Sequence, residues 1–371
     1  MVARVLIVGG YGNFGSYIAG SLAPDPQIQL LIGGRAKAKA LAFAARLGGA
    51  NAAEGHVIDI DGDLAAAFER TLPDIVVHTT GPFQRQDHRV ARACIAHGCH
   101  YLDLADARDF VVSIGELDAA ARERGVIVVS GASSVPCLTA AVIDHYRPSF
   151  AQLDSIEYGI SAAQQTNRGL ATTSAVLSYV GKPLLQLCDG RMQRVFGWQD
   201  THAVCYPELG LRLFGNCDIP DLDLFPRRYP EVRSIRFAAG HELMILHAGT
   251  WALGWLVRFG LVRSLDAHAK RLLKLAFLFD RFGSSRSGFH MFLTGEGRDG
   301  RPRRVRFFII ARSGHGPYIP CMPAILLARR LSRDELGARG ALPCLDLIGL
   351  DEYLGALEGL DISVHADLLD A

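Results

Sequence analysis

The feature that most constrains the fold is an alternation of short β-branched runs with alanine-rich, helix-compatible segments over the first 130 residues. Repeated β-then-α units predict a parallel sheet with right-handed crossovers, and continuous apolar runs such as VLIV and IVVH predict a sheet covered on both faces. We expect strands at 5–8, 28–32, 56–60, 75–78, 100–104 and 126–130. We expect helices at 14–22, 37–47, 64–69, 88–97 and 114–124.

From about residue 151 the pattern changes to half-exposed, alternating strands, and two of these flank an Asp299-Gly300 turn that is typical of a hairpin. A chain of 371 residues also exceeds the roughly 250 residues that one core supports. We therefore predict an α/β protein with an N-terminal doubly wound Rossmann domain (1–150) and a second α+β domain with a mostly antiparallel sheet (151–318). A C-terminal helical segment (319–371) is expected to return to the first domain. The second domain should hold an irregular loop at 215–231 and a helical insert at 241–282.

Composition narrows the function classes. The net charge is +1 and 49% of the residues are hydrophobic, so no global field favours nucleic acid, and the chain has enough apolar surface for a large core. The eight cysteines contain no CxxC pair and are expected to be free thiols in a reducing compartment. No signal peptide is apparent at the N-terminus, so we expect a cytoplasmic protein. The excess of 34 arginines over five lysines suggests GC-rich coding and a bacterial source.

A glycine-rich GxGxxG motif follows the first strand and opens the first helix. In such a motif Gly10 permits a tight turn, Gly12 lets the backbone approach a pyrophosphate, and Gly15 lets helix and strand pack closely. Its position after a strand and before a helix makes the motif specific for a dinucleotide. The expected cofactor loop is Gly10, Tyr11, Gly12, Asn13, Phe14 and Gly15.

The end of the second strand distinguishes NADP from NAD. NAD enzymes place an acidic residue there for the ribose 2′-hydroxyl. This chain instead has Arg35, followed by Lys37, and a guanidinium suits a 2′-phosphate. We therefore expect NADP, although Arg35 could simply begin a solvated helix. Asp59 ends the third strand and could meet the adenine or cap the next helix.

Three further strand ends should lie at the same edge of the sheet, where ligands bind in doubly wound folds. Thr80, Gly81 and Pro82 follow the fourth strand and are expected beside the nicotinamide ribose. Asp103 and Asp106 follow the fifth strand; one could be structural and the other chemically active. Ser133 follows the sixth strand, where it could face the nicotinamide or cap a helix that begins near residue 136.

Five segments in this order and spacing resemble the saccharopine dehydrogenase-like NADP-binding family: GGYGNFG, IGGR, TTGPFQ, ARACIAHGCHYLDLAD and GASSVPCLTAAVIDHY. The resemblance covers residues 4–147 and continues more loosely beyond them. It implies a Rossmann domain plus an α/β domain that carries the substrate pocket and often the dimer contact. Family members include reductases that join amines to aldehydes through an imine, and distant relatives are implicated in enoyl reduction. The second domain does not match the amino-acid-metabolising members closely, which leaves the substrate open.

These features predict an NADP(H)-dependent oxidoreductase that transfers hydride to or from a C=N or C=O bond of a small or amphipathic substrate. A C=C (enoyl) reductase and a non-catalytic NADP sensor or scaffold are the alternatives. No Tyr-xxx-Lys pair follows the nucleotide domain, so Asp106 is the first candidate for the catalytic acid. His315 in the SGHGPYIP stretch is the second.

Two other constellations are interpreted as structural. The cysteines and histidines at 94–100 and the aspartates at 218–223 could suggest a metal, but a helix end and a polar loop explain them better, and no metal is expected. The apolar segment 243–262 contains His247 and Arg258 and is a poor membrane span. Its stripe of Met244, His247, Trp251, Trp255 and Phe259 should pack in protein, over a substrate tunnel or in a homodimer, with membrane-surface contact as the alternative.

Overall fold

The computed structural model describes residues 2–166 and 168–370, which form two compact units. The first unit contains Met1–Ala141 and Tyr318–Ala356, and the second contains Val142–Pro317 and Leu357–Ala371. The C-terminal segment differs from the expected helical piece. Its last part forms strand β16 (Ile362–Asp370), which pairs with the second unit's sheet and not with the first unit. The α/β fold class itself is confirmed.

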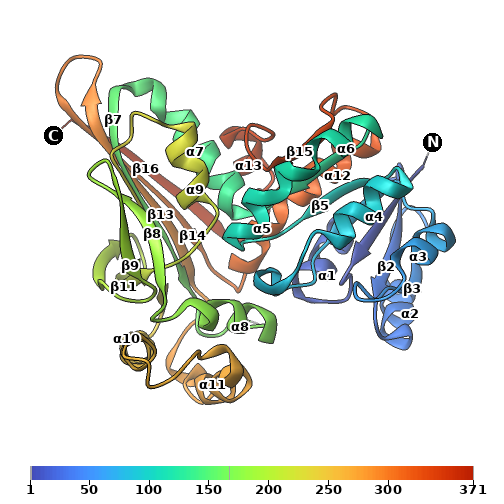
Figure 1. Cartoon of the computed structure of the whole chain (residues 1–371), viewed down its shortest axis with the longest axis horizontal. Coiled ribbons are helices and arrows are strands. Elements are labelled where there is room, and N and C mark those ends of the chain that lie inside the picture. Colours follow the sequence, from blue (N-terminus) through green and yellow to red (C-terminus); the bar gives the residue numbers. More distant parts are fainter. Residues whose placement is uncertain (1, 167, 371) are drawn as a thin grey trace. The chain divides into compact units, whose positions relative to one another are not determined.

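The first unit is built on a seven-stranded parallel sheet in the order β15-β6-β5-β4-β1-β2-β3 (Figure 1). Five of these strands match the expected positions, and β3 lies earlier than the expected 56–60. The seventh strand, β15, arrives from the C-terminal part of the chain and pairs with β6. The reversal of strand order at β1 and β4 is the place where doubly wound sheets bind ligands. The strands are β1 (Ala3–Val8), β2 (Ile28–Gly34), β3 (Glu54–Val57), β4 (Ile75–His78), β5 (His100–Asp103), β6 (Ile127–Ser130) and β15 (Gly340–Pro343).

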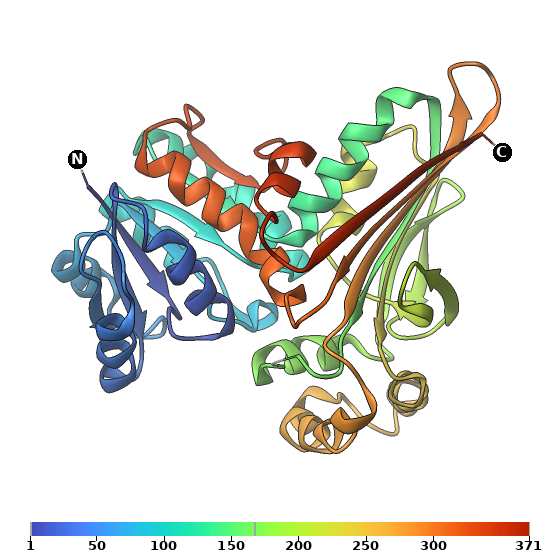
Figure 2. The same ribbon diagram turned by 180° about the vertical axis from the view of Figure 1, so that it is seen from behind.

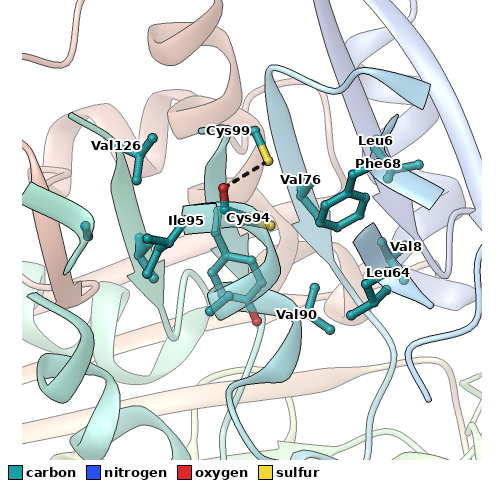
Figure 3. Packing of buried hydrophobic residues seen from close by; sticks show 14 of the residues in the cluster. Leu6, Val8, Leu64, Phe68, Val76, Val90, Cys94, Ile95, Cys99 and Val126 are labelled. Atoms are coloured by element: carbon teal, nitrogen blue, oxygen red, sulfur yellow. Dashed lines mark hydrogen bonds between the residues drawn. The ribbon is translucent and has the colours of Figure 1, made fainter. Parts of the chain in front are cut away.

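Helices cover both faces of this sheet. On one face, side chains from α3, α4 and α6 join those of the strands in a continuous apolar cluster, which includes Phe68, Cys94 and Cys99 (Figure 3). The Cys99 thiol points to the Cys94 carbonyl oxygen, which it approaches to 3.7 Å, so these cysteines are core side chains. On the other face α1 packs against α12. The helices are α1 (Asn13–Leu22), α2 (Lys37–Arg46), α3 (Leu64–Thr71), α4 (Arg89–His97), α5 (Arg108–Val112), α6 (Asp118–Glu123), α12 (Met322–Ser332) and α13 (Leu350–Gly355).

The second unit is built on a mixed seven-stranded sheet in the order β10-β11-β12-β7-β13-β14-β16 (Figure 2). Its pairs are antiparallel except for β12 with β7, so the predicted mostly antiparallel sheet is confirmed. The predicted hairpin at Asp299-Gly300 joins β13 to β14. The strands are β7 (Phe150–Ala162), β10 (His202–Tyr206), β11 (Gly210–Asn216), β12 (Ser234–His241), β13 (Ser287–Gly297) and β14 (Pro302–Ala311), with β8 (Pro183–Cys188) and β9 (Arg191–Phe196) forming a separate ribbon.

Helices occupy the remainder of the second unit: α7 (Thr139–Tyr146), which contains the boundary between the units, α8 (Leu170–Tyr179), α9 (Asp221–Arg228), α10 (Met244–Arg258) and α11 (Ala269–Phe277). The prediction of an irregular loop at 215–231 is wrong, because α9 forms there. Asp221 and Asp223 lie in its first turn, where carboxylates favour the helix dipole. Asp221 also accepts a hydrogen bond from the buried Tyr158 hydroxyl at 2.9 Å.

The segment 243–262 forms α10, and no helix in the described part of the chain is long and apolar enough to cross a membrane. The expected packing of its aromatic stripe is not found within the second unit. Met244, Trp251 and Phe259 are exposed, whereas His247 and Gly254 are the buried residues of the helix. The helix therefore buries the side that carries His247 and Gly254 and exposes the side that carries Met244, Trp251 and Phe259.

Candidate cofactor and active site

The glycine-rich turn after β1 is shaped by close contacts. The left-handed residue is Gly9, with φ of +87°, and not Gly10 as the motif suggested. Gly10 is needed for space, since a Cβ there would lie 2.9 Å from the Ile7 carbonyl oxygen. A Cβ at Gly15 would lie 2.3 Å from the Gly9 carbonyl oxygen, so Gly15 brings helix and strand together. At Gly12 a Cβ would meet only the Gly9 oxygen, at 3.1 Å, and this side of the turn is otherwise open.

Helix α1 begins directly after this turn, with Asn13 and Phe14 in its first turn and Gly12 as its N-cap. The cap makes no side-chain hydrogen bond, and no acidic residue lies in the first turn. The start of the helix thus keeps its positive end of the dipole for an anion that approaches over Gly12.

Tyr11 joins the glycine-rich turn to the end of β2. Its hydroxyl accepts a hydrogen bond from the backbone N–H of Ala36 at 3.1 Å. Its ring lies against Gly34, where a Cβ would come within 2.3 Å of the ring carbon Cε1. Gly34 is therefore required to admit the tyrosine ring, and the contact fixes the backbone on both sides of Arg35.

Arg35 and Lys37 are exposed at the carboxyl end of β2. Among the described residues no carboxylate lies within ion-pair distance of Arg35, so its guanidinium is available to an anion. Asp59 is exposed after β3, where its carboxylate accepts the backbone N–H of Asp61 at 3.2 Å. The alternative that Asp59 caps the next helix is wrong, because Asp63 caps α3 through a bond to the N–H of Ala66.

The turn after β4 packs directly on the glycine-rich turn. A Cβ at Gly9 would lie 2.7 Å from the Thr79 hydroxyl and 2.8 Å from the Thr80 methyl group. The Gln86 side-chain amide holds the turn from the other side, by donating to the carbonyl oxygens of Thr80 at 2.6 Å and Pro82 at 3.2 Å. The loop Thr80, Gly81 and Pro82 is thus fixed beside the cofactor motif of the same unit.

A buried hydrogen-bond chain, which the sequence did not reveal, runs from this turn into the sheet. The Nε2 atom of His78 lies 2.6 Å from the Thr80 hydroxyl, and its Nδ1 atom lies 3.0 Å from the Tyr101 hydroxyl. Burial lowers the pKa of His78 to about 3, so the imidazole is neutral. A neutral imidazole donates from one nitrogen and accepts at the other, which fixes the Thr80 hydroxyl in one orientation. The histidine that ends the otherwise apolar IVVH strand was the sequence feature that could have indicated this hydrogen-bond chain.

Asp103 is fully buried at the end of β5 and holds two neighbouring strand ends. Its Oδ1 atom accepts the backbone N–H groups of Ala105 at 2.9 Å and Gly131 at 2.8 Å, and the Ser130 hydroxyl at 3.0 Å. Burial raises its pKa from 3.8 to about 6. Because the folded protein keeps this proton to a higher pH than the unfolded chain, the group favours folding below about pH 4 and loses that contribution as the pH rises through about 6.

The Asp103→Ala variant is expected to lose about 2–4 kcal/mol of unfolding free energy at neutral pH, because three buried donors lose their acceptor. Asp103→Asn should cost less, since an amide oxygen still accepts, and its stability should change less between about pH 4 and 7. Urea unfolding at both pH values measures these differences. An alanine variant as stable as the unchanged protein would contradict the structural role.

Asp106 lies three residues after Asp103, and part of its residue surface is exposed. The Gln84 side-chain amide, which belongs to the turn that follows Pro82, donates to its Oδ1 atom at 3.1 Å. Protein around this group raises its pKa, although the side chain keeps an exposed surface, and Gln84 opposes that rise. Asp106 is thereby held beside the turn at 80–84.

The remaining candidates lie elsewhere. Ser133 is buried and makes no side-chain cap, so the expectation that it caps the following helix is wrong. Its backbone N–H instead bonds to the Gly131 carbonyl oxygen, and a π-turn (Ser134–Leu138) precedes α7.

His315 belongs to the second unit, where its Nδ1 atom accepts the backbone N–H of Asp361 at 2.8 Å. In the described residues no group of three or more His, Cys, Asp or Glu side chains is placed to hold a metal ion.

Comparison with known proteins finds a family model and solved structures similar to this chain. Residues 5–129 match the family model of the saccharopine dehydrogenase NADP binding domain. The chain is similar in fold to saccharopine dehydrogenase (L-Glu forming) from Saccharomyces cerevisiae, with a TM-score of 0.71, 12% identity, and coverage of 98% of this chain and 100% of the yeast chain. An amine dehydrogenase from Mycobacterium smegmatis gives a TM-score of 0.48 at 12% identity and covers 95% of this chain and 96% of its own. No curated protein matches.

The residues at the carboxyl edge of the first sheet fit NADP. Gly12 leaves the backbone open to a pyrophosphate, the start of α1 favours an anion, and the unpaired Arg35 replaces the acid that would select NAD. Residues 5–129 thus match the saccharopine dehydrogenase NADP binding domain, which supports NADP as the cofactor, and the chain has a saccharopine dehydrogenase-like fold.

Proposed function

We propose that this protein is an NADPH-dependent reductase of a C=N or C=O bond in a small or amphipathic substrate, with Asp106 as the catalytic acid. The observation that supports this most is the position of Asp106, whose carboxyl group is tied by Gln84 to the turn at 80–84. That turn packs on the cofactor motif through Thr79 and Thr80. Bound NADPH supplies hydride to carbon, and the nitrogen or oxygen of the reduced bond must then gain a proton.

Different side chains of the first unit suit the binding of the cofactor and the donation of the proton. Gly12, Arg35 and the start of α1 hold the phosphates, and Thr80 is oriented by His78. A carboxyl group whose pKa is raised keeps its proton to a higher pH, which makes Asp106 a better proton donor near neutrality. Gln84 fixes the direction of that donor. An enoyl reductase would need to deliver the proton to a carbon atom instead. The position of Asp106 gives no preference for carbon.

The Asp106→Asn variant is expected to lower kcat by about 100-fold or more, because general acids typically contribute that much, while the Kd for NADPH changes less than about twofold. Steady NADPH oxidation with imine, carbonyl and enoyl substrates measures the first effect, and titration of NADPH fluorescence measures the second. Asp109→Asn, in the first turn of α5, is the matched control and should behave as the unchanged protein.

Full activity of Asp106→Asn would move the search for the acid to the second unit, where His315 is the next candidate. Oxidation of NADPH with enoyl substrates alone would favour the C=C alternative. Tight NADPH binding without turnover of any of the three classes would favour the sensor. The proposal also includes a homodimer, and it places the protein in the reducing cytoplasm because none of the eight cysteines forms a disulfide. Light scattering is expected to give twice the mass of the chain.

A further inference from the structure

The outward face of α10 is apolar throughout. Met244, Ile245, Trp251, Leu256 and the following Phe259 are all exposed, and Ala248, Gly249 and Ala252 lie among them. At 100° per residue these positions share one side of the helix, and no charged residue interrupts them. An ordinary surface helix has the reverse arrangement, with its polar side facing water.

The segment after α10 continues this exposed surface. Phe259 is 70% exposed, Leu261 73%, Leu278 68% and Phe282 61%. In α11 Leu275 and Phe277 are exposed as well, and Ala269 is the one buried residue of that helix. We call the outward surface of residues 244–282 the α10–α11 patch. The exposed apolar side chains of α10 are neighbours on one side of that helix, and apolar surface of this kind marks an interaction site.

The inner sides of both helices explain why the patch faces outward. Leu253 and Val257 of α10 and Leu272 of α11 pack on one cluster that contains Trp198 and Leu265. Both views show α10 and α11 at the same end of the second unit's sheet (Figures 1 and 2). The two helices are therefore anchored on a shared core, and their other sides have no cover within their own unit.

The patch is also basic. It carries six cationic side chains against two acidic ones, Asp266 and Asp280. Asp280 is already engaged, because it accepts a hydrogen bond from Gln164 and pairs with Arg168. Within the described residues none of the six cations forms an ion pair; they are Arg258, Arg263, Lys270, Arg271, Lys274 and Arg281.

Arg258 shows how such a cation is held at the rim of the apolar face. Its guanidinium lies 4.0 Å from the ring centroid of Phe196 and 4.6 Å from that of Trp255. The stacking fixes the charge beside these two half-buried rings without neutralising it. Arg281 lies in the same way 4.5 Å from the ring of Phe282.

We propose that the α10–α11 patch docks on the surface of an anionic lipid bilayer, with its helices lying in the interface and not crossing it. Exposed aromatic and aliphatic side chains would enter the boundary between headgroups and acyl chains, while the unpaired cations meet lipid phosphates. Trp251 and Trp255 are of the residue type that favours this boundary. A second copy of the same patch would bring the same positive charges together, whereas phosphates neutralise them.

Co-sedimentation of the full chain with vesicles tests this inference. The protein is expected to bind phosphatidylcholine vesicles that contain about 30% phosphatidylserine, to bind pure phosphatidylcholine much more weakly, and to be released by salt. The Phe259→Glu/Leu261→Glu variant should lower the partition coefficient by about tenfold or more. Lys270→Glu/Lys274→Glu should lower it on the anionic vesicles alone.

The matched control is Leu185→Glu/Met192→Glu, which changes two exposed apolar side chains of the β8–β9 ribbon and should leave vesicle binding unchanged. Unaltered circular dichroism and thermal unfolding show that each variant is folded. Protein that stays in the supernatant with both kinds of vesicle overturns the inference. A dimer that the Phe259→Glu/Leu261→Glu variant converts to a monomer, without vesicle binding by either, would show instead that the patch joins two subunits.

Discussion

Gly12→Val is expected to lower the affinity for NADPH by about 100-fold or more while the protein stays folded. The space at Gly12 is open except for the Gly9 carbonyl oxygen, 3.1 Å from where a Cβ would lie, so the chain itself tolerates a side chain there. A pyrophosphate must approach the backbone at this position, and a valine would hold it away from the start of α1. Losing one or two charged hydrogen bonds, each about 1.5–3 kcal/mol, accounts for the size of the effect.

Calorimetric titration with NADPH measures this loss, and thermal unfolding in the absence of NADPH measures the fold. Gly20→Val is the matched control, because Gly20 lies in the same helix and no atom comes within 4 Å of the position of its Cβ. The control should bind NADPH normally. Gly15→Val has a different expected result, since its side chain would collide with the Gly9 backbone and destabilise the domain itself. Near-normal affinity in Gly12→Val would place the pyrophosphate elsewhere.

Local sequence patterns were sufficient to predict most of the strands and helices of the first unit. The apolar runs, glycines and alanine-rich helices follow one another within about 30 residues, which is the length of one βαβ unit, so each unit is visible in the sequence. Strand β15 was not predicted. It has four residues, ends in Pro343 and pairs with β6 from more than 200 positions away, so no local periodicity marks it. Strand β16 was missed for a related reason, because only its pairing with β14 reveals its place.

The candidate site was predictable in its positions and less so in its contacts. The glycines, Arg35 and the strand ends were located from spacing, because parallel strands bring their carboxyl ends to one edge. The chain from Thr80 through His78 to Tyr101 depends on how β4 and β5 are aligned, with Val76 opposite Tyr101 and His78 opposite Asp103. That register is a tertiary property. The left-handed conformation of Gly9 likewise follows from its contact with the β4 turn and not from the motif.

Helix α9 was misjudged because its polar residues and its proline were taken to indicate a loop. The sequence DLDLFPRR contains a proline and two aspartates, which suggested a loop, yet Pro226 lies within α9 and the aspartates stabilise its first turn. The stripe in α10 was expected to pack in protein, over the substrate pocket or against a second subunit, and this expectation stays a prediction. The structure buries the narrower side with His247 and Gly254.

Arg35→Asp is expected to reverse or erase the preference of this protein for NADPH over NADH. The guanidinium is exposed and unpaired, and the contacts of Tyr11 with Gly34 and Ala36 fix the backbone on both sides of Arg35, so this side chain suits a 2′-phosphate. Removing its charged hydrogen bonds should weaken NADPH binding by about 1–3 kcal/mol, or roughly 10- to 100-fold, while the new carboxylate would accept the ribose 2′-hydroxyl of NADH.

Calorimetric titration of the unchanged protein and of Arg35→Asp, each with NADPH and with NADH, gives the ratio of the two affinities. This ratio is the quantity that is expected to change. Arg70→Asp, an exposed arginine in α3, carries the same change in charge away from the cofactor edge and should keep the original ratio. The unchanged protein provides the sharpest test, because the end of β2 has no acidic residue for the ribose of NADH. Equal affinities of that protein for NADPH and NADH would mean that Arg35 does not contact the 2′-phosphate and only begins a solvated helix.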